Sequence, residues 1–574
     1  MQNPYKEISA DIEVHVGRRA AAISIFIFLC IISLPPLYRN IFALNKSLIS
    51  DTNSAWVPAI EIFKKSSENT IGEHLQEYEN NLESAGFTEP PRRLVQTLLS
   101  NGPLREGNGK TRIGKDGWLF LKTALDSLTG YGPIEIEPTS VSKDPRLTHW
   151  QSPLNAIKRF AEQLNEFGVE LVIVSIPVKP MIYPEHLGQS AKGPITHPDS
   201  ETFYSFLSSL PNVDVLDLTL PLSKLKSKSK VFLKQDTHWT PEGMKESAKI
   251  IATYVKSKNW NYGNRNLKAG PDENRSSLGD LVESLNTYSK IFDLETVIAS
   301  PVTGKTVDRE SPIILLGDSF TNIYSTDTTL NWGKNAGLAD HIALNLGSSL
   351  DVIAINGGGA TEARKKLAAR KGSASLMKNK KAVIWAITAR DLFLSSTQAH
   401  KARVHWEYVN FDTREPKENL ISSTKIHARM LSKPKLPNPK STTYSSLLYG
   451  ADYEILETIT GKIETVENKI AVIHWAYKNR QMLPTSNYKV GEKRILNLIP
   501  FDRIKELRTL EQHYDGDLFD FYWDLPETSN EIHGKSRIHQ ENTSNSHLIA
   551  SAGCSLFALI LVFLVKLIIK HNEQ

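Results

Sequence analysis

Cysteine is nearly absent from this chain of 574 residues, which contains only Cys30 and Cys554. Both lie inside the two most apolar segments, so the long stretch between these segments has no thiol. That stretch therefore contains no disulfide, no cysteine nucleophile and no thiolate metal site. It also lacks a dinucleotide-binding fingerprint, a phosphate-binding loop and histidines at metal-ligand spacing. We accordingly expect neither a bound nucleotide cofactor nor a metal ion.

A strong excess of one charge is missing as well, because 68 Lys and Arg stand against 63 Asp and Glu, a net charge of +5. This mild excess excludes neither a nucleic acid nor an anionic polymer as a partner. The 32 glycines and 29 prolines give no fibrous or disordered bias, and 40% of the residues are hydrophobic, as in globular proteins. The length exceeds what one hydrophobic core supports, which favours two folded units with accessory segments.

Long hydrophobic runs are few: the chain has two, which excludes a polytopic transporter. We predict transmembrane helices over 20–38 and 548–569. The alternatives are a cleaved signal peptide for the first segment and a buried core helix for the second. Basic residues flank both segments on the side of the chain ends, as at Arg19 and Lys570. Because basic flanks stay in the cytoplasm, we expect both termini there and the residues between the spans outside.

The central part of the chain alternates between amphipathic and continuously apolar segments. Helical spacing of apolar residues occurs over 153–168, 200–210 and 241–256, and runs of buried-strand type occur over 171–177, 213–218, 312–316, 352–355 and 382–388. Strands that alternate with helices in this way predict an α/β fold, a doubly wound parallel five-stranded sheet. In such sheets the ligand binds beyond the carboxyl ends of the strands.

After this part the pattern changes to short alternating runs such as AVIHWAY, which predict a small all-β domain. Exposed rings there, for example Trp475 and Tyr477, would bind glycan; the alternative is that these rings form the core of the domain. The predicted division is a cytoplasmic N-terminus (1–19), a transmembrane anchor (20–38), a stalk (39–110), the α/β catalytic domain (111–399), a basic linker (400–449), the β domain (450–525), a tether (526–547), a transmembrane helix (548–569) and a cytoplasmic tail (570–574).

Residues able to perform chemistry follow the predicted strands. Ser319 comes directly after the buried run ending at Gly317, and Asp236 and His238 lie in the loop before the helix at 241–256. A serine hydroxyl attacks carbonyl groups only when a base takes its proton and a carboxylate orients that base. Because the carboxyl ends of parallel strands share one edge of a sheet, these residues predict a Ser-His-Asp catalytic triad.

A second set of residues at this edge is a candidate for binding the substrate or stabilising an oxyanion. Asn356 and Gly357 begin a glycine-rich turn after the run 352–355, and Trp239 follows the predicted base. Backbone N–H groups of such a turn can stabilise a developing negative charge. Each motif alone also has a simpler interpretation, since Asp-Thr-His before a helix and Asn-Gly-Gly-Gly are common in caps and turns.

The motif Gly317-Asp318-Ser319-Phe320, taken with Asp236-x-His238-Trp239, resembles the SGNH-like domain of the alginate O-acetyltransferase family. The segments GKDGWLFL (114–121) and IPVKPMIYPE (176–185) are similar to flanking signatures of that family. The resemblance covers about 110–395, and the β domain resembles an accessory domain of some relatives. It implies acetyl transfer to an exported polysaccharide through an acetyl-serine.

The resemblance also implies the setting of the reaction. The acetyl group would come indirectly from acetyl-CoA through a multispanning membrane acyltransferase partner, since acetyl-CoA does not cross membranes. The chain would lie in the bacterial inner membrane with its main domains in the periplasm, which disfavours a nucleic acid partner. The alternatives that remain open are a polysaccharide acetyl-esterase with the same triad and a non-catalytic polysaccharide-binding scaffold.

Two basic clusters favour an anionic polymer such as a polyuronate as the partner. Four lysines precede the Asp-His loop between Lys224 and Lys230. The segment 362–381 contains eight further basic residues, among them Arg364, Arg370 and Lys380, and only one acid, Glu362. A groove lined by these residues would suit such a polymer; the alternative is that they form solvated helix faces.

Overall fold

The computed structural model describes residues 89–525 with interruptions, the longest of which are 134–151 and 412–422. The predicted transmembrane segments at 20–38 and 548–569, with most of the predicted stalk, lie outside the described residues. Among the helices of the described part, none is long and apolar enough to cross a membrane.

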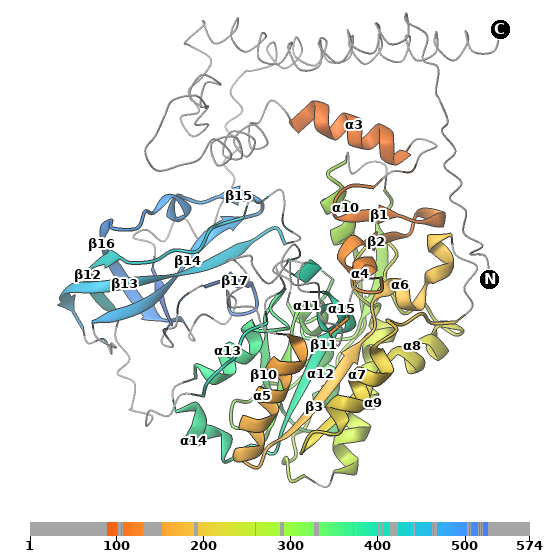
Figure 1. The fold of residues 1–574 in the computed structure, drawn as a ribbon, viewed down its shortest axis with the longest axis horizontal. Helices are drawn as coiled ribbons and strands as arrows, with labels where there is room; N and C mark the ends of the chain where they lie inside the picture. The colour runs from red at the N-terminus through yellow and green to blue at the C-terminus, as the bar shows by residue number, and fades with distance from the viewer. Residues whose placement is uncertain are drawn as a thin grey trace, which may run out of the picture. The chain divides into compact units, whose positions relative to one another are not determined.

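Five parallel strands form the central sheet, in the spatial order β10-β9-β11-β3-β4 (Figure 1). They are β3 (Glu170–Ile176), β4 (Val213–Asp217), β9 (Ile313–Gly317), β10 (Asp351–Ala354) and β11 (Ala382–Thr388). Each coincides with a predicted strand to within one or two residues. The central strands are buried on both faces, which explains why they read as continuous apolar runs.

Helices cover both faces of this sheet, as a doubly wound fold requires. One core joins the odd residues of β3, such as Ile173, to α5 (Pro153–Glu166), α7 (Ser200–Ser208), α13 (Glu362–Ala368) and α14 (Ser373–Met377). The other core joins Val172 and Val174 to α8 (Thr219–Lys226), α9 (Pro241–Ser257), α11 (Ser319–Asn322) and α12 (Leu338–Leu346). Successive strand residues thus point into opposite cores, and the predicted α/β class is confirmed.

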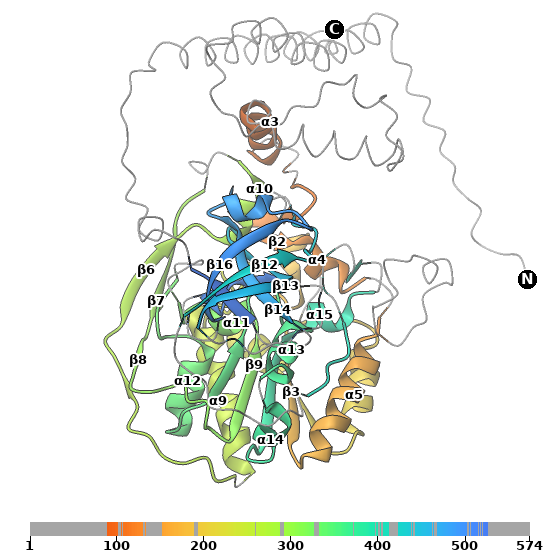
Figure 2. The same cartoon turned by 90° about the vertical axis from the view of Figure 1, so that its left-hand side faces the viewer.

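The polar insertion after α9 builds its own small elements beside the domain. Strands β6 (Glu273–Ser277) and β7 (Glu295–Ala299) pair antiparallel, as Figure 2 shows, and α10 (Asp280–Leu285) lies between them in the chain.

The other α-helices and strands before the all-β region are α3 (Glu89–Asn101), β1 (Thr111–Ile113), β2 (Leu119–Leu121), α4 (Lys122–Asp126), α6 (Lys179–Ile182), β5 (Lys268–Ala269), β8 (Val302–Thr303) and α15 (Ala389–Phe393).

The all-β region is a seven-stranded sheet in the order β15-β14-β18-β16-β12-β13-β17. Its strands are β12 (Thr424–Met430), β13 (Leu447–Thr460), β14 (Lys469–Lys478), β15 (Gln481–Met482), β16 (Lys493–Pro500), β17 (Glu511–His513) and β18 (Phe521–Asp524). A further pairing between β13 and β14 closes the sheet into a barrel-like ring. The predicted all-β character of this region is confirmed.

The prediction of an irregular linker over 400–449 is wrong for 424–430, because β12 pairs there with both β13 and β16. Only Ile426 and Met430 of its four fully inward positions are large apolar residues, the others being Thr424 and Ala428. Because the hydrophobic alternation of these four residues is weak, the sequence pattern did not predict a strand here.

The predicted basic groove is wrong for three of its members, which are structural. Arg364 is fully buried, and its guanidinium lies 5.2 Å from the Trp385 ring. Arg370 makes a two-point ion pair with Asp351, at 2.6 and 2.8 Å, and the buried Lys380 reaches the same carboxylate at 2.9 Å. These cations therefore neutralise internal acids or pack on rings and do not face a polymer.

Candidate active site

A short antiparallel turn carries Asp236 and His238 to the carboxyl edge of the sheet. Phe232 and Trp239 form an isolated β-bridge, and the backbone N–H of Leu233 donates to the carbonyl of His238 at 3.0 Å. Thr240 then caps α9, because its side chain accepts a hydrogen bond from the N–H of Gly243 at 3.3 Å. The bridge and the cap therefore hold the residues between Phe232 and Trp239 at the start of α9.

Two buried side chains hold the outer part of this turn. The Glu295 carboxylate of β7 accepts hydrogen bonds from the backbone N–H groups of Lys234 and Gln235, at 2.7 and 2.9 Å. The ammonium of Lys179 donates to the carbonyls of Leu119 and Lys234, at 2.7 and 3.2 Å. Burial lowers the pKa of Lys179 to about 8. The two family-like segments GKDGWLFL and IPVKPMIYPE thus meet on the turn that carries Asp236.

Ser319 begins α11 directly after the end of β9. Gly317 makes the tight approach possible, because a Cβ at this position would lie 2.1 Å from Oγ1 of Thr321. The side chain of Asp318 caps the turn by accepting a hydrogen bond from the N–H of Phe320 at 2.9 Å. Burial, and then the charge of Asp391, raises the pKa of Asp318 to about 6.

The three predicted catalytic residues come together in one chain of hydrogen bonds. Nε2 of His238 lies 2.7 Å from Oγ of Ser319, and Nδ1 lies 2.6 Å from Oδ1 of Asp236. All three side chains are at most 4% exposed. Burial alone would lower the pKa of His238, but the negative charges of Asp236, Asp280 and Asp318 outweigh it and raise that pKa.

Asp236 is held as a carboxylate by several donors. Its Oδ2 accepts hydrogen bonds from the backbone N–H of Asp280 at 3.0 Å and from the indole N–H of Trp332 at 3.1 Å. Burial by itself would raise its pKa, but the charge and hydrogen bonds of His238, together with the N–H of Asp280, lower it to about 2. An anionic Asp236 fixes the ring of His238 with Nε2 toward the serine.

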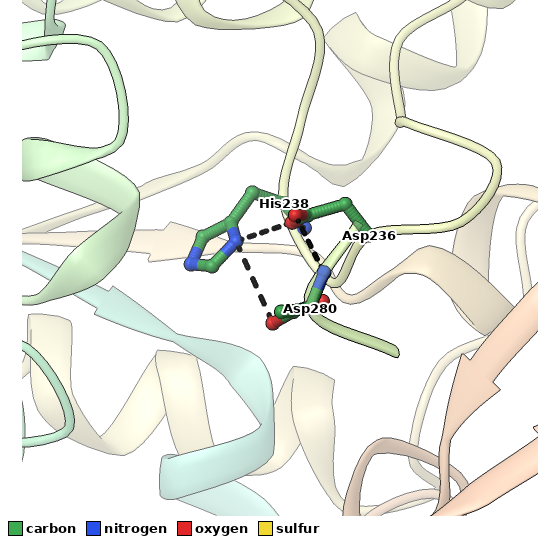
Figure 3. A group of neighbouring side chains, drawn as sticks. All are labelled: Asp236, His238 and Asp280. Carbon is green, nitrogen blue, oxygen red and sulfur yellow. Dashed lines mark hydrogen bonds and ion pairs between the residues drawn. The ribbon is translucent and has the colours of Figure 1, made fainter. Parts of the chain in front are cut away.

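Asp280 is a second acid beside the same ring, and Figure 3 shows both carboxylates directed at Nδ1 of His238. Its Oδ2 lies 3.9 Å from Nδ1 and has no hydrogen-bond partner among the described residues, while Oδ1 accepts from the N–H of Thr237 at 2.7 Å. Burial, and then the charge of Asp236, raises the pKa of Asp280 to about 7.

The side chains of Asp236, His238 and Asp280 also offer ligand atoms within 4.8 Å of one another, a spacing that could hold a metal ion. The short hydrogen bond between Nδ1 of His238 and Asp236 accounts for that spacing without an ion. We therefore interpret the cluster as an acid–base group that acts on Ser319 through its hydrogen bond with His238.

The other predicted site residues have further partners. The N–H of Asn356 donates to the carbonyl of Thr509 at 3.0 Å, and its Oδ1 accepts from Nδ2 of Asn322 at 3.0 Å. Gly357 has a φ of +74°, and the ring of Tyr444 lies over it. Trp239 is fully buried, and its indole N–H donates to the carbonyl of Phe320 at 3.1 Å. The structure therefore places Trp239 beneath the site as support.

Three residues around the triad escaped the sequence analysis: Asp280, Trp332 and Tyr444. The hydroxyl of Tyr444 donates to Oγ of Ser319 at 2.9 Å, although 125 residues separate them. None of the three lies in a motif, and all reach the site from loops or insertions far along the chain. Only the fold brings them to Asp236 and Ser319.

Comparison with known proteins identifies relatives of the α/β domain. Residues 111–389 match the family model described as the SGNH hydrolase-like domain of the acetyltransferase AlgX. The probable alginate O-acetylase AlgJ of Pseudomonas aeruginosa is 30% identical over 210 residues, which are 36% of this chain and 49% of that protein. The AlgJ of Pseudomonas putida is 29% identical over 150 residues, 26% of this chain and 35% of that protein. The chain thus spans half or less of these curated relatives.

Solved structures with similarity include the O-acetyltransferase domain of Pseudomonas putida AlgJ, at 22% identity and a TM-score of 0.37, over 50% of this chain and 93% of that one. Pseudomonas aeruginosa AlgX is similar at 16% identity and a TM-score of 0.35, over 71% of this chain and 94% of that one. The family resemblance that the motifs indicate is confirmed by the match over 111–389.

Proposed function

Because residues 111–389 match the family model of the SGNH hydrolase-like domain of AlgX, we propose that this chain is an O-acetyltransferase acting on an exported, anionic polysaccharide. The observation that carries the proposal is the continuous relay from Asp236 through His238 to Ser319, with hydrogen bonds of 2.6 and 2.7 Å. The names of the relatives, alginate O-acetylases, support acetyl transfer to a polysaccharide.

In the first half-reaction Ser319 is the nucleophile. Its Oγ bonds to the carbonyl carbon of an acetyl donor while Nε2 of His238 takes the hydroxyl proton. The imidazolium that forms is stabilised by Asp236, whose low pKa keeps it ionised. When the tetrahedral intermediate collapses, the bond to the leaving group breaks, and His238 returns the proton to that group. The product is acetyl-Ser319.

In the second half-reaction a sugar hydroxyl replaces the donor. His238, again neutral, takes the proton of the sugar hydroxyl as its oxygen bonds to the acetyl carbon. Collapse of this intermediate breaks the bond to Oγ, and the proton on His238 returns to Ser319. The enzyme ends as it began, and the polysaccharide carries an acetyl ester.

The donor and the location complete the proposal. We propose that a multispanning membrane acyltransferase partner delivers the acetyl group from acetyl-CoA, with no cofactor bound to this chain. The described domains would then lie in the periplasm, attached to the inner membrane. Hydrophobic segments at 20–38 and 548–569 support this arrangement.

Substitution of the proposed nucleophile tests the function. We expect Ser319→Ala to lower transfer from an activated acetyl ester to an oligosaccharide by on the order of 10⁴-fold or more, because triad members act as a unit. Ser208→Ala, an exposed serine of α7, is the matched control and should keep full activity. Mass spectrometry of the acid-quenched wild type should locate an acetyl group on the peptide containing Ser319.

Full activity of Ser319→Ala, or an acetyl group on another peptide, would refute the mechanism. Product analysis with and without the acceptor separates transfer from hydrolysis. Acetate as the sole product at saturating acceptor would instead identify the chain as a polysaccharide acetyl-esterase. Failure of a sulfonyl fluoride to label Ser319 would favour a non-catalytic scaffold.

A further inference from the structure

Tyr444 reaches the nucleophile from the all-β region and not from the α/β domain. It lies between β12 and β13, in the segment just before β13 begins at Leu447. Its hydroxyl donates to Oγ of Ser319 at 2.9 Å. The proposed mechanism assigns no role to this contact.

The β region fixes the position of this segment. Arg480, in the turn after β14, donates through Nη1 to the carbonyls of Pro439 and Thr442, at 2.8 and 3.1 Å. The hydroxyl of the buried Tyr477 donates to Oγ1 of Thr442 at 2.8 Å. Two residues of the barrel-like sheet therefore hold the chain on the amino-terminal side of Tyr444.

The same region also lies on the glycine-rich turn after β10. A Cβ on Gly357 would lie 2.9 Å from Cε2 of Tyr444 and 3.6 Å from Cγ of Glu511. The carbonyl of Thr509 accepts a hydrogen bond from the N–H of Asn356 at 3.0 Å. The ring of Tyr444 therefore lies against the glycine-rich turn, which the β region also contacts through Thr509 and Glu511.

Oγ of Ser319 has two partners that act in opposite directions. His238 Nε2, at 2.7 Å, is placed to take the hydroxyl proton, and Tyr444 Oη, at 2.9 Å, donates a proton to an oxygen lone pair. When Oγ attacks, a lone pair goes into the new bond to carbon. The carbonyl oxygen on that carbon then becomes negative next to Oγ, where the Tyr444 hydroxyl already points.

We propose that Tyr444 is a catalytic residue that passes its hydrogen bond from Oγ of Ser319 to the oxyanion of the acetyl group. The inference rests on the proposed function and deepens it, because the all-β region then supplies part of the active site. Burial, and then the charge of Asp318, raises the pKa of Tyr444, so its hydroxyl keeps its proton over the working pH range. A donor fixed in advance in a buried site stabilises the transition state with little reorganisation.

The test is Tyr444→Phe in the full chain, with hydrolysis of 4-nitrophenyl acetate measured in the pre-steady state. Loss of one oxyanion donor lowers kcat by roughly 100-fold to 1,000-fold, and we expect this loss in the acylation rate with little change in KM. The matched control is Tyr453→Phe, which removes a buried hydroxyl bonded to His474 in the same sheet. It should lower stability without lowering the acylation rate.

Two other results would overturn the proposal. An acylation rate of Tyr444→Phe that equals the wild-type rate would remove Tyr444 from the mechanism. A faster rate would mean that the tyrosine restrains Ser319 in the resting enzyme. Ser319→Ala, measured in parallel, keeps the two hypotheses separate. If Ser319→Ala is inactive and Tyr444→Phe is unchanged, only the role of Tyr444 fails; if Ser319→Ala is active, the proposed function fails first.

Discussion

The carboxylate of Asp280 gives His238 a second negative neighbour besides Asp236, 3.9 Å from Nδ1. Both charges stabilise the imidazolium and so raise the pKa of His238. A base must be neutral to take the proton of Ser319, so activity should fall as the pH drops through this pKa. The acidic limb of the pH profile therefore depends on Asp280 to the extent that its carboxyl, with a pKa of about 7, is ionised.

We expect Asp280→Asn to move the acidic limb of kcat/KM to lower pH, because the imidazolium loses one stabilising charge. The asparagine oxygen can still accept the hydrogen bond from the N–H of Thr237. Glu283→Gln, a more exposed acid of the same helix α10, is the control and should leave the limb in place. A limb that stays at the wild-type pH in Asp280→Asn would show that the charge of Asp280 does not reach His238.

The same substitution should also change the stability of the protein, and its effect on stability should depend on pH. The folded-state pKa of Asp280, about 7, lies above its ordinary value of 3.8. Its contribution to stability is therefore complete below the unfolded pKa and is lost as the pH rises toward and past 7. The melting temperature of Asp280→Asn, relative to wild type, should rise between pH 4 and pH 8. A difference that stays constant over this range would contradict the raised pKa.

Residues of the site could be predicted where chemistry and local sequence coincide. Asp236 and His238 are two residues apart, and Ser319 follows a strand, so strand-end geometry alone brings them to one edge. Asp280 and Tyr444 could not be found in this way. Each lies in a segment whose sequence has no motif, and only packing against the turn at 235–238 or over Gly357 brings it to the triad.

At the scale of the elements, Gly279 allows the start of α10 to pack closely against the turn that carries Asp236. A Cβ at Gly279 would lie 2.1 Å from the carbonyl oxygen of Gln235 and 2.5 Å from the N of Asp236. Both atoms belong to the backbone and cannot move without shifting Asp236. The hydrogen bond from the N–H of Asp280 to Asp236 depends on this approach.

We expect Gly279→Ala to lower kcat by roughly 10-fold to 100-fold, since a displacement of about 1 Å at a catalytic group has effects of that size. Gly109→Ala is the control, because a Cβ there would meet nothing within 4 Å. Steady-state kinetics and thermal melts of both variants provide the measurement. Wild-type kcat in Gly279→Ala would show that the turn can move without disturbing Asp236.

Elements with a simple hydrophobic pattern were predictable, and those with a mixed pattern were not. The five strands of the parallel sheet are buried on both faces, so their apolar runs define them directly. β12 has one buried face built partly from Thr424 and Ala428, which gives no clear alternation. The basic residues of α13 likewise gave no sign that Arg364 would be buried, because cation–ring contacts depend on Trp385 and Trp406 from other parts of the chain.

At the scale of the whole molecule, the proposed role of Tyr444 makes the all-β region and the α/β domain one catalytic unit. Arg480 does not touch Ser319, but it holds the segment that carries Tyr444 through the carbonyls of Pro439 and Thr442. Loss of these two hydrogen bonds should therefore reduce activity only by displacing Tyr444.

We expect Arg480→Met to lower the acylation rate by roughly 10-fold to 100-fold, because the Tyr444 hydroxyl would no longer be held in position. Arg429→Met, which removes an exposed pair with Glu454 in the same sheet, is the control and should leave the rate unchanged. The decisive measurement is the double mutant Arg480→Met/Tyr444→Phe. If Arg480 acts through Tyr444, this double mutant is no slower than Tyr444→Phe, because the interaction is already lost. Additive losses would mean that Arg480 affects the site by another route, and the β region would then be coupled to catalysis without the tyrosine as the link.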